Sequence, residues 1–255
     1  MHAPTYLNPW VKCLNPTSTP ALRLFCLPYA GGGSAIFRSW LHQLPSSIEI
    51  CPIQLPGREE RVREPAFEAI APLVQTVSRH IRPYLDVPYA FFGHSMGALI
   101  SFELAQKLRF HQAPPPLHLF VSGCRAPHIP NPRQLHTLAD SLLLHELKCL
   151  KGTPQQILDN PELMQLLMPT LRADFAICET YTYIEQPPLD CPISVFGGTE
   201  DSEAPADDLK AWHRYTRLPL SLFWLPGNHF FLNTRRTLLL EIIAVQLKQH
   251  SEQFF

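Results

Sequence analysis

Short apolar runs alternate along the chain with segments of helical spacing, and this alternation restricts the fold more than any other feature. Each run is almost continuously hydrophobic and is bounded by Gly, Pro or polar residues, as strands covered on both faces are. The runs are 22–27, 48–53, 89–92, 117–122, 193–197 and 220–225, and helical spacing occurs in 67–82, 98–110 and 237–248. The pattern predicts an α/β fold in one domain, residues 1–255, with a mostly parallel sheet and helices on both faces.

Residues 127–187 interrupt this alternation, because they contain no convincing strand. A helical pattern covers 135–150, and helical pieces separated by Pro and Gly follow around Ile157, in 163–168 and in 171–181. A structureless loop of this length inside a compact domain would be unusual. We therefore expect a helical insertion that folds over one end of the sheet as an active-site lid.

Composition and charge exclude several classes of protein. Of the 255 residues, 45% are hydrophobic and 17% are charged, which suits a large buried core and excludes a disordered chain. Lys and Arg number 21 against 22 Asp and Glu, so the basic excess of a nucleic-acid-binding protein is missing. No apolar run is long enough to span a membrane, and the N-terminus lacks the apolar region of a signal peptide.

The seven cysteines are scattered and form no C-x-x-C pair, which is typical of reduced and mostly buried thiols. The sequence thus predicts a soluble cytoplasmic protein that binds neither nucleic acid nor membranes. A monomer is the default expectation.

Ser95 is the candidate nucleophile, in the sequence Gly93-His94-Ser95-Met96-Gly97. A bare G-x-S-x-G motif is weak, but this one lies between a predicted strand and a predicted helix, the context that gives the motif its mechanism. The tight turn strains the serine backbone, and the glycines let neighbouring chain pass close by. The serine then stands at a helix N-terminus, which favours developing negative charge. His94 is expected to point away from Ser95.

A serine hydroxyl needs an adjacent base, and His229 is the best placed of the twelve histidines. It follows the last predicted strand in a Pro-Gly turn, which brings a side chain to the carboxyl edge of the sheet. Hydrolases with a G-x-S-x-G turn between a strand and a helix keep the order serine, acid, histidine along the chain. The acid should therefore follow the strand at 193–197. Asp201 is our choice, and Glu200, one residue away, remains a competitor. The acid orients the histidine and stabilises its protonated form.

The glycine-rich segment 28–34, PYAGGGS, suits an oxyanion hole. It matches neither G-x-x-x-x-G-K-[ST] nor G-x-G-x-x-G, which argues against a phosphate or dinucleotide site. We expect the backbone amides of Ala30 and Met96 to hold the substrate oxygen. H-E-x-x-H is absent and the His and Cys residues lack zinc spacing, so no metal site is predicted. Covalent serine chemistry needs no cofactor.

Several motifs, in order through nearly the whole chain, resemble those of the type II thioesterases that accompany nonribosomal peptide and polyketide synthases. They are LFCLPYAGG at 24–32, QLPGREER at 54–61, GHSMGA at 93–98, FVSGCRAP at 120–127, LRADF at 171–175 with ETY at 179–181, and GNHFF at 227–231. Together they are far more specific than G-x-S-x-G alone.

The resemblance implies an α/β-hydrolase fold in which Ser95, Asp201 and His229 form the triad. The spacing Gly-Gly-x-x-Asp, which the family uses, favours Asp201 over Glu200. The implied substrate is an acyl group on the phosphopantetheine arm of an acyl or peptidyl carrier protein, so this arm belongs to the substrate and is not a bound cofactor. The implied role is editing, in which stalled or mis-primed acyl groups are cleared from a synthase.

Three other functions stay open. A general carboxylesterase or lipase would use the same triad on oxygen esters, and a cyclising or transferring release enzyme would give lactones or esters as products. A catalytically silent module that only binds the carrier protein is the third. The basic residues of the second motif region, Arg58, Arg61 and Arg63, are expected to form a solvated charged segment.

Overall fold

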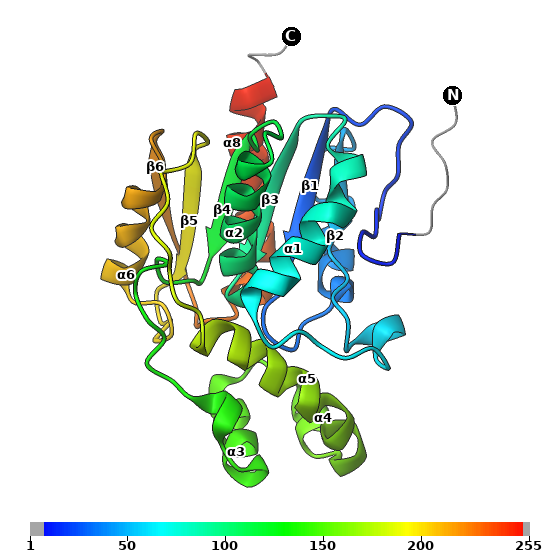
Figure 1. Cartoon of the computed structure of the whole chain (residues 1–255), viewed down its shortest axis with the longest axis vertical. Helices are drawn as coiled ribbons and strands as arrows, with labels where there is room; N and C mark the ends of the chain where they lie inside the picture. The colour runs from blue at the N-terminus through cyan, green and yellow to red at the C-terminus, as the bar shows by residue number, and fades with distance from the viewer. Residues whose placement is uncertain (1–7, 252–255) are drawn as a thin grey trace.

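The computed structural model describes residues 8–251, which fold around a six-stranded sheet in the order β2-β1-β3-β4-β5-β6 (Figure 1). All neighbouring strands in it are parallel. The strands are β1 (Leu22–Leu27), β2 (Ile48–Pro52), β3 (Tyr89–His94), β4 (His118–Ser122), β5 (Ile193–Gly198) and β6 (Leu220–Leu225). Each coincides with a predicted apolar run, so the predicted fold class is confirmed.

Helices cover both faces of the sheet (Figure 1). Successive side chains of a strand point to opposite faces; Phe25 and Leu27 of β1 pack into the core with α1 and α2, whereas Leu24 and Cys26 pack into the core with η1 and α8. The helices of these layers are η1 (Ser34–Trp40), α1 (Ile70–Ile81), α2 (Met96–Phe110), α6 (Ala206–Lys210), η5 (Ala211–Tyr215) and α8 (Arg236–Ser251). Short turns of helix also occur at η2 (Glu59–Arg61), η3 (Arg82–Tyr84) and α7 (Phe231–Thr234).

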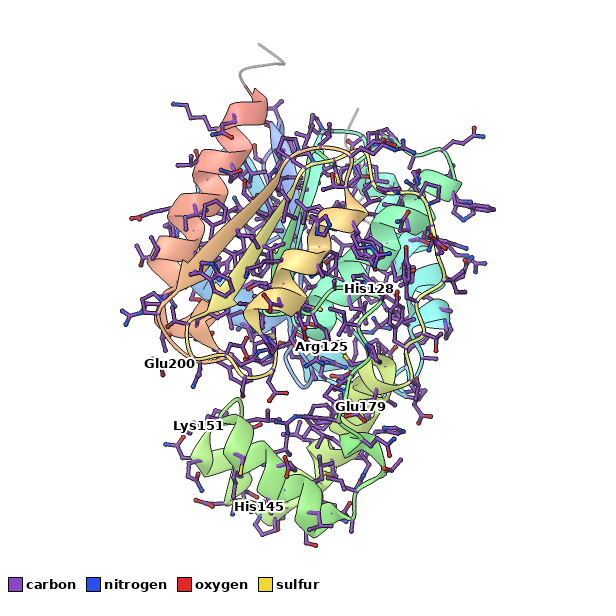
Figure 2. All side chains as sticks on the ribbon, turned by 90° about the vertical axis from the view of Figure 1, so that its left-hand side faces the viewer. Arg125, His128, His145, Lys151, Glu179 and Glu200 are labelled. Atoms are coloured by element: carbon purple, nitrogen blue, oxygen red, sulfur yellow. The ribbon has the colours of Figure 1, made fainter. Side chains whose placement is uncertain are left out.

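Between β4 and β5 lie four helical elements with their own apolar cluster, a part of the chain that we call the helical insertion (Figures 1 and 2). Its elements are η4 (Leu135–Thr137), α3 (Asp140–Leu150), α4 (Gln155–Leu158) and α5 (Pro161–Glu179). Figure 2 labels His145 on α3 and Glu179 at the end of α5. This insertion lies beyond the end of the sheet at which β3 turns into α2 (Figure 1).

The expectation of separate helical pieces at 163–168 and 171–181 is wrong, because α5 runs unbroken through Pro169. A proline inside a helix removes one N–H and leaves the carbonyl four residues earlier without its donor. Here that carbonyl belongs to Gln165, and both residues are exposed. Water can therefore replace the missing donor, and the helix continues.

No helix within residues 8–251 combines the length and the apolar character that crossing a membrane requires.

The packing of α2 gives a test of the core. Phe102 is fully buried, and its ring meets those of Trp212 and Tyr215 edge-on at centroid distances of 5.5 and 5.2 Å. We expect Phe102→Ala to lower the free energy of unfolding by about 3–5 kcal/mol, because it leaves a cavity. Phe110, on the same helix, is 79% exposed, so Phe110→Ala should change stability by less than about 0.5 kcal/mol. Denaturant unfolding checks both; equal effects would contradict this description of the core.

Candidate active site

Ser95 lies at a sharp turn between β3 and α2, with φ 54° and ψ −119°. Positive φ is a strained conformation for a residue with a side chain. A Cβ atom on Gly93 would lie 2.2 Å from the carbonyl oxygen of Gly97, and one on Gly97 would lie 2.1 Å from that of Leu27. The Ser95 N–H donates to the Ser122 carbonyl oxygen at 2.8 Å. The turn therefore needs both glycines and presents the serine at the N-terminus of α2.

His229 and Asp201 meet at the same edge of the sheet. Nδ1 of His229 lies 2.9 Å from Oδ2 of Asp201, whose side chain is fully buried. The other carboxylate oxygen accepts the Glu203 N–H at 2.9 Å. A carboxylate accepts hydrogen bonds, so this contact favours the tautomer in which Nδ1 carries the imidazole proton and Nε2 has a free lone pair.

Of the two carboxylates that the sequence left open, Asp201 is the one in contact with His229. Glu200 is exposed at the start of the loop that follows β5. Its N–H donates to the Gly227 carbonyl oxygen at 2.9 Å. This backbone bond joins the two loops, and it keeps the Asp201 loop in register with the turn that leads to His229.

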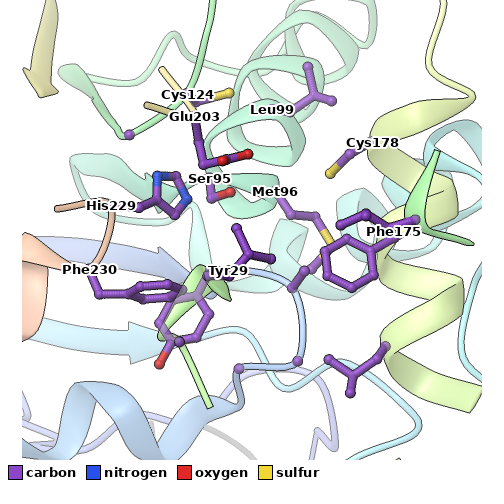
Figure 3. A pocket seen from close by; sticks show the side chains of 18 of the residues that line it. Tyr29, Ser95, Met96, Leu99, Cys124, Phe175, Cys178, Glu203, His229 and Phe230 are labelled. Carbon is purple, nitrogen blue, oxygen red and sulfur yellow. The ribbon is translucent and has the colours of Figure 1, made fainter. Parts of the chain in front are cut away.

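Ser95 and His229 line one cavity of about 430 Å³, together with Ala30 and Met96 (Figure 3). Met96 is the first residue of α2, so its N–H is one of the amides that no carbonyl of the same helix can accept. Ala30 lies in the turn that follows β1 and also lines the cavity. The cavity thus holds all the residues expected of a nucleophile, a base and an oxyanion hole, with Asp201 behind the base.

The remaining walls of the cavity are mostly apolar and come largely from the helical insertion. Side chains of α3 and α5 face it, together with Leu99 of α2; those from the insertion include Leu147, Leu167, Leu171 and Phe175. Such a lining suits a hydrophobic group.

Two cysteines also line the cavity. Burial raises the pKa of Cys124 to about 12 and raises that of Cys178 well above the ordinary thiol value. Only a thiolate is strongly nucleophilic. Both groups are therefore neutral at physiological pH, and neither competes with Ser95.

A buried ion pair fastens the helical insertion to the loop beside Ala30. Arg58 makes two hydrogen bonds of 2.8 Å to the carboxylate of Asp174 on α5, and the two side chains are 5% and 1% exposed. Asp174 also accepts the Gly31 N–H at 2.7 Å, and Arg58 donates to the Gly32 carbonyl oxygen at 2.9 Å. The pair therefore holds α5 against the turn that follows β1.

The expectation that Arg58, Arg61 and Arg63 form a solvated segment is wrong for the first two. Arg63 is exposed, but Arg61 is 7% exposed, with its guanidinium 4.1 Å from the ring centre of Trp10. The carboxylate that pairs with Arg58 is 116 residues away in the sequence. No local pattern could therefore reveal that this charge is neutralised inside the protein.

His94 packs against His229, a contact that the sequence did not indicate. The ring centroids are 5.0 Å apart, and Nδ1 of His94 lies 2.8 Å from the hydroxyl of Ser122. Burial, and then the nearby His229, lower the pKa of His94 well below its usual range. His94 is therefore neutral at pH 7, and its buried ring supports the ring of His229 from behind.

The Arg58–Asp174 pair makes a stability prediction. We expect Asp174→Asn to lower the free energy of unfolding by about 3–5 kcal/mol, because Arg58 then stays buried without a counter-charge. The double variant Arg58→Met/Asp174→Leu, which buries no charge, should be clearly more stable than Asp174→Asn. Denaturant unfolding of both checks this. A double variant no more stable than the single one would show that the unpaired charge is not the cause.

His94 makes a prediction about pH. Its folded-state pKa is lowered, so below about pH 6.5 the unfolded chain binds a proton that the folded chain does not. The free energy of unfolding therefore decreases as the pH is lowered. Between pH 7.5 and 5.5 the wild type should lose about 1.4 kcal/mol more than His94→Asn does. Urea unfolding at the two pH values measures both losses. If wild type and His94→Asn lose the same free energy of unfolding, His94 is protonated in the folded protein at pH 5.5 and the account is wrong.

Comparison with known proteins agrees with this geometry. The family model described as thioesterase domain matches residues 22–247. The chain is 44% identical over 243 residues to the gramicidin S biosynthesis protein GrsT of Aneurinibacillus migulanus, covering 95% of each chain. The RedJ thioesterase from the prodiginine pathway of Streptomyces coelicolor superposes with a TM-score of 0.83 at 41% identity, over 90% of this chain and 91% of that one. The type II thioesterase BorB from the borrelidin cluster superposes with a TM-score of 0.86 at 33% identity, over 93% and 97%. The chain therefore belongs to the thioesterase family: it is a serine thioester hydrolase of the type II group, with an α/β-hydrolase fold.

Proposed function

We propose that Ser95, His229 and Asp201 hydrolyse acyl thioesters carried on the phosphopantetheine arm of an acyl or peptidyl carrier protein. One observation carries the assignment of the residues: Ser95 and the Asp201-bonded His229 share one end of a mostly apolar cavity. The carrier protein as partner is supported by the relatives, among them a gramicidin S biosynthesis protein and a thioesterase of the prodiginine pathway.

In the proposed first half of the reaction, the Ser95 hydroxyl oxygen attacks the thioester carbonyl carbon and its proton passes to Nε2 of His229. The amides of Ala30 and Met96 hold the oxyanion; the loss of one such donor typically costs about 2.7–4 kcal/mol of barrier lowering. The carbon–sulfur bond then breaks, and the leaving sulfur takes the proton from His229. An acyl group is left on Ser95.

In the second half, His229 takes a proton from water, and the resulting hydroxide attacks the acyl-serine carbonyl. The tetrahedral intermediate collapses, Ser95 regains its proton from His229, and the free acid leaves. Asp201 stabilises the imidazolium in both halves without accepting its proton. Side chains, backbone amides and water supply every group in this proposed cycle, so it requires no bound cofactor or metal.

Residues 127–187 serve as a lid in this proposal, within a single domain that spans residues 1–255. The acyl chain lies among the apolar residues of α3 and α5, while the pantetheine arm enters toward Ser95.

The biological role that follows is editing: acyl groups that stall a synthase are removed as free acids. We further propose that the enzyme acts as a monomer in the cytoplasm, where a carrier protein would be its partner.

The acid of the triad gives the first test. With acetyl- and longer acyl-carrier proteins as substrates, Asp201→Asn should lower kcat by about 10²–10⁴-fold, because the imidazole loses the group that fixes its tautomer and stabilises its charge. The adjacent Glu200→Gln is the matched control and should stay within about twofold of wild type. The assignment fails if Glu200→Gln is the crippled variant and Asp201→Asn is not.

The substrate class gives the second test. We expect kcat/KM for a carrier-bound thioester to exceed that for a simple oxygen ester of the same acyl group by at least about tenfold, which corresponds to about 1.4 kcal/mol. Mass spectrometry of the products should find the free acid. Faster cleavage of the oxygen ester would indicate a general carboxylesterase, and lactone or ester products would indicate a release enzyme.

A further inference from the structure

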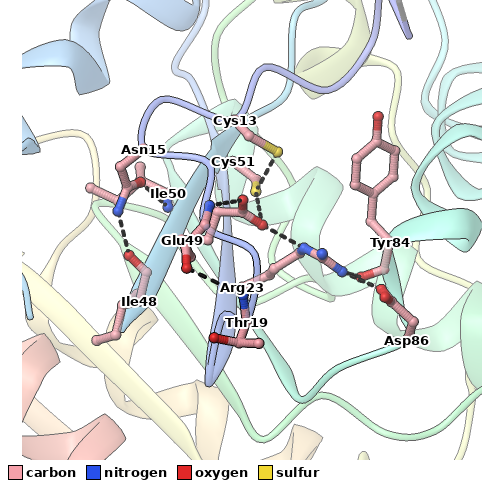
Figure 4. A network of polar contacts seen from close by, with 11 residues as sticks. Cys13, Asn15, Thr19, Arg23, Ile48, Glu49, Ile50, Cys51, Tyr84 and Asp86 are labelled. Carbon is pink, nitrogen blue, oxygen red and sulfur yellow. Dashed lines mark hydrogen bonds and ion pairs between the residues drawn. The ribbon is translucent and has the colours of Figure 1, made fainter. Parts of the chain in front are cut away.

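The segment that precedes β1 pairs with β2, the edge strand of the sheet (Figure 4). The Lys12 N–H donates to the Pro52 carbonyl oxygen at 3.0 Å, and the Leu14 N–H donates to the Ile50 carbonyl oxygen at 2.9 Å. These bonds define an antiparallel register in which residues 13 and 51 are opposite each other, between two hydrogen-bonded pairs. At such positions the Cα atoms are about 4.5 Å apart and the side chains are closest. That spacing lies within the range of about 4.4–6.8 Å that a disulfide bridges.

The two residues at this position are Cys13 and Cys51, and their sulfur atoms lie 3.2 Å apart (Figure 4). Both are free thiols. Cys51 is fully buried, whereas Cys13 is partly exposed. A disulfide bond is about 2.05 Å long, so the sulfurs need to approach by only about 1 Å. The reaction proposed above uses neither of them.

Glu49 lies beside the pair, and the ligand atoms of the three side chains lie within 4.8 Å of one another, which is close enough to share a metal ion. However, Oε2 of Glu49 already accepts a hydrogen bond of 2.6 Å from Nε of Arg23. A cation bound here would lie next to the Arg23 guanidinium, and residues 8–251 would offer it only these three side-chain ligands. The positive charge therefore favours thiol–thiol chemistry over metal binding.

We propose that Cys13 and Cys51 form a reversible disulfide, which ties the N-terminal segment to β2 under oxidising conditions. The oxidant class is a hydroperoxide. The sulfur of Cys13 attacks one oxygen of the peroxide and the O–O bond breaks. The other oxygen departs as an alcohol, or as water when the oxidant is hydrogen peroxide, and Cys13 becomes a sulfenic acid. The sulfur of Cys51 then displaces hydroxide from the Cys13 sulfur, and water leaves with the Cys51 proton. The two thiols lose two electrons, which reduce the hydroperoxide.

The order of these steps follows from the environments of the two thiols. The hydrogen bond from Cys51 lowers the pKa of Cys13, and the same bond together with burial raises the pKa of Cys51. Cys13, which is also the more exposed, therefore has the larger thiolate fraction of the two and is the thiol that meets the oxidant. Cys51 is the resolving thiol, already in contact with the sulfur that it must attack.

The disulfide would close a loop from residue 13 to residue 51 that contains β1 and η1. It would also fix Lys12, whose Nζ lies 3.6 Å from Oε2 of Glu59. Glu59 in turn accepts hydrogen bonds from the Ser34 hydroxyl and the Ala35 N–H, at 2.5 and 2.8 Å. Because a crosslink of this length restricts the unfolded chain, we expect the oxidised protein to melt about 5–10 °C higher than the reduced one.

The experiment uses the full chain with Cys149→Ser, because Cys149 is the exposed cysteine and could join two molecules. The reduced protein is treated with hydrogen peroxide, then unfolded in iodoacetamide and digested without reductant. Mass spectrometry should find the peptide of Cys13 joined to that of Cys51. The melting temperature should rise by about 5–10 °C, and dithiothreitol should reverse both changes.

Two variants in the Cys149→Ser background provide controls. Cys13→Ser, at a partly exposed position, should remain folded but lose both the crosslink and the change in melting temperature. Cys191→Ala, which removes a different buried thiol, should keep the crosslink. The proposal is overturned if Cys13 and Cys51 are both alkylated after peroxide treatment, or if Cys13 is oxidised to the sulfinic acid without a crosslink. Zn²⁺ that stays bound through desalting and requires both cysteines would also overturn it, in favour of a metal site.

Discussion

The strained backbone of Ser95 is held between a strand and a helix, and the geometry of the site depends on that turn. A conformation of this kind costs about 1–3 kcal/mol and persists only where the surroundings over-determine it. Here the Ser95 N–H is bonded to Ser122 on the neighbouring strand, and Gly97 packs directly against the backbone of Leu27. The serine is thus fixed by β1, β3, β4 and α2 together. Its position relative to the His229 turn follows from the sheet and not from a flexible loop.

The other residues of the candidate site are also held by contacts between segments. One backbone bond joins the Glu200 N–H to Gly227, so the loop of the acid and the turn of the base form one unit. The Arg58–Asp174 pair joins the turn beside Ala30 to α5. A displacement of α5 would therefore be transmitted to the backbone that is proposed to hold the oxyanion. If the proposed substrate binds under the insertion, this pair would link that binding to the stabilisation of charge at the carbonyl.

The fold was predictable from the sequence because its signals are local. The apolar runs became strands even at the edge, where β6 is only partly buried, and G-x-S-x-G between a strand and a helix identified the turn. The sequence could not separate Asp201 from Glu200 by its own chemistry, since one residue of shift in a loop exchanges them; the resemblance to the family favoured Asp201, whose carboxylate contacts His229 in the structure. Only the fold brings one of them to His229.

What the sequence missed depends on partners that are distant in the chain. The burial of Arg58 needs Asp174, the pairing of Cys13 needs Cys51, and nothing near either residue announces its partner. The helix break expected near Pro169 does not occur, and here the local signal was strong. It was overridden because the carbonyl left without a donor lies on the solvent side of α5.

The central claim is that Ser95 carries the acyl group between the two halves of the reaction. Rapid mixing with a long-chain acyl-carrier protein, acid quenching within the first turnover and peptide mapping by mass spectrometry test it directly. We predict that the mass of the acyl group is found on the peptide that contains Ser95 and that it disappears as the free acid forms. An acyl group found on another residue, or hydrolysis that proceeds without any acyl-enzyme on Ser95, would contradict this account.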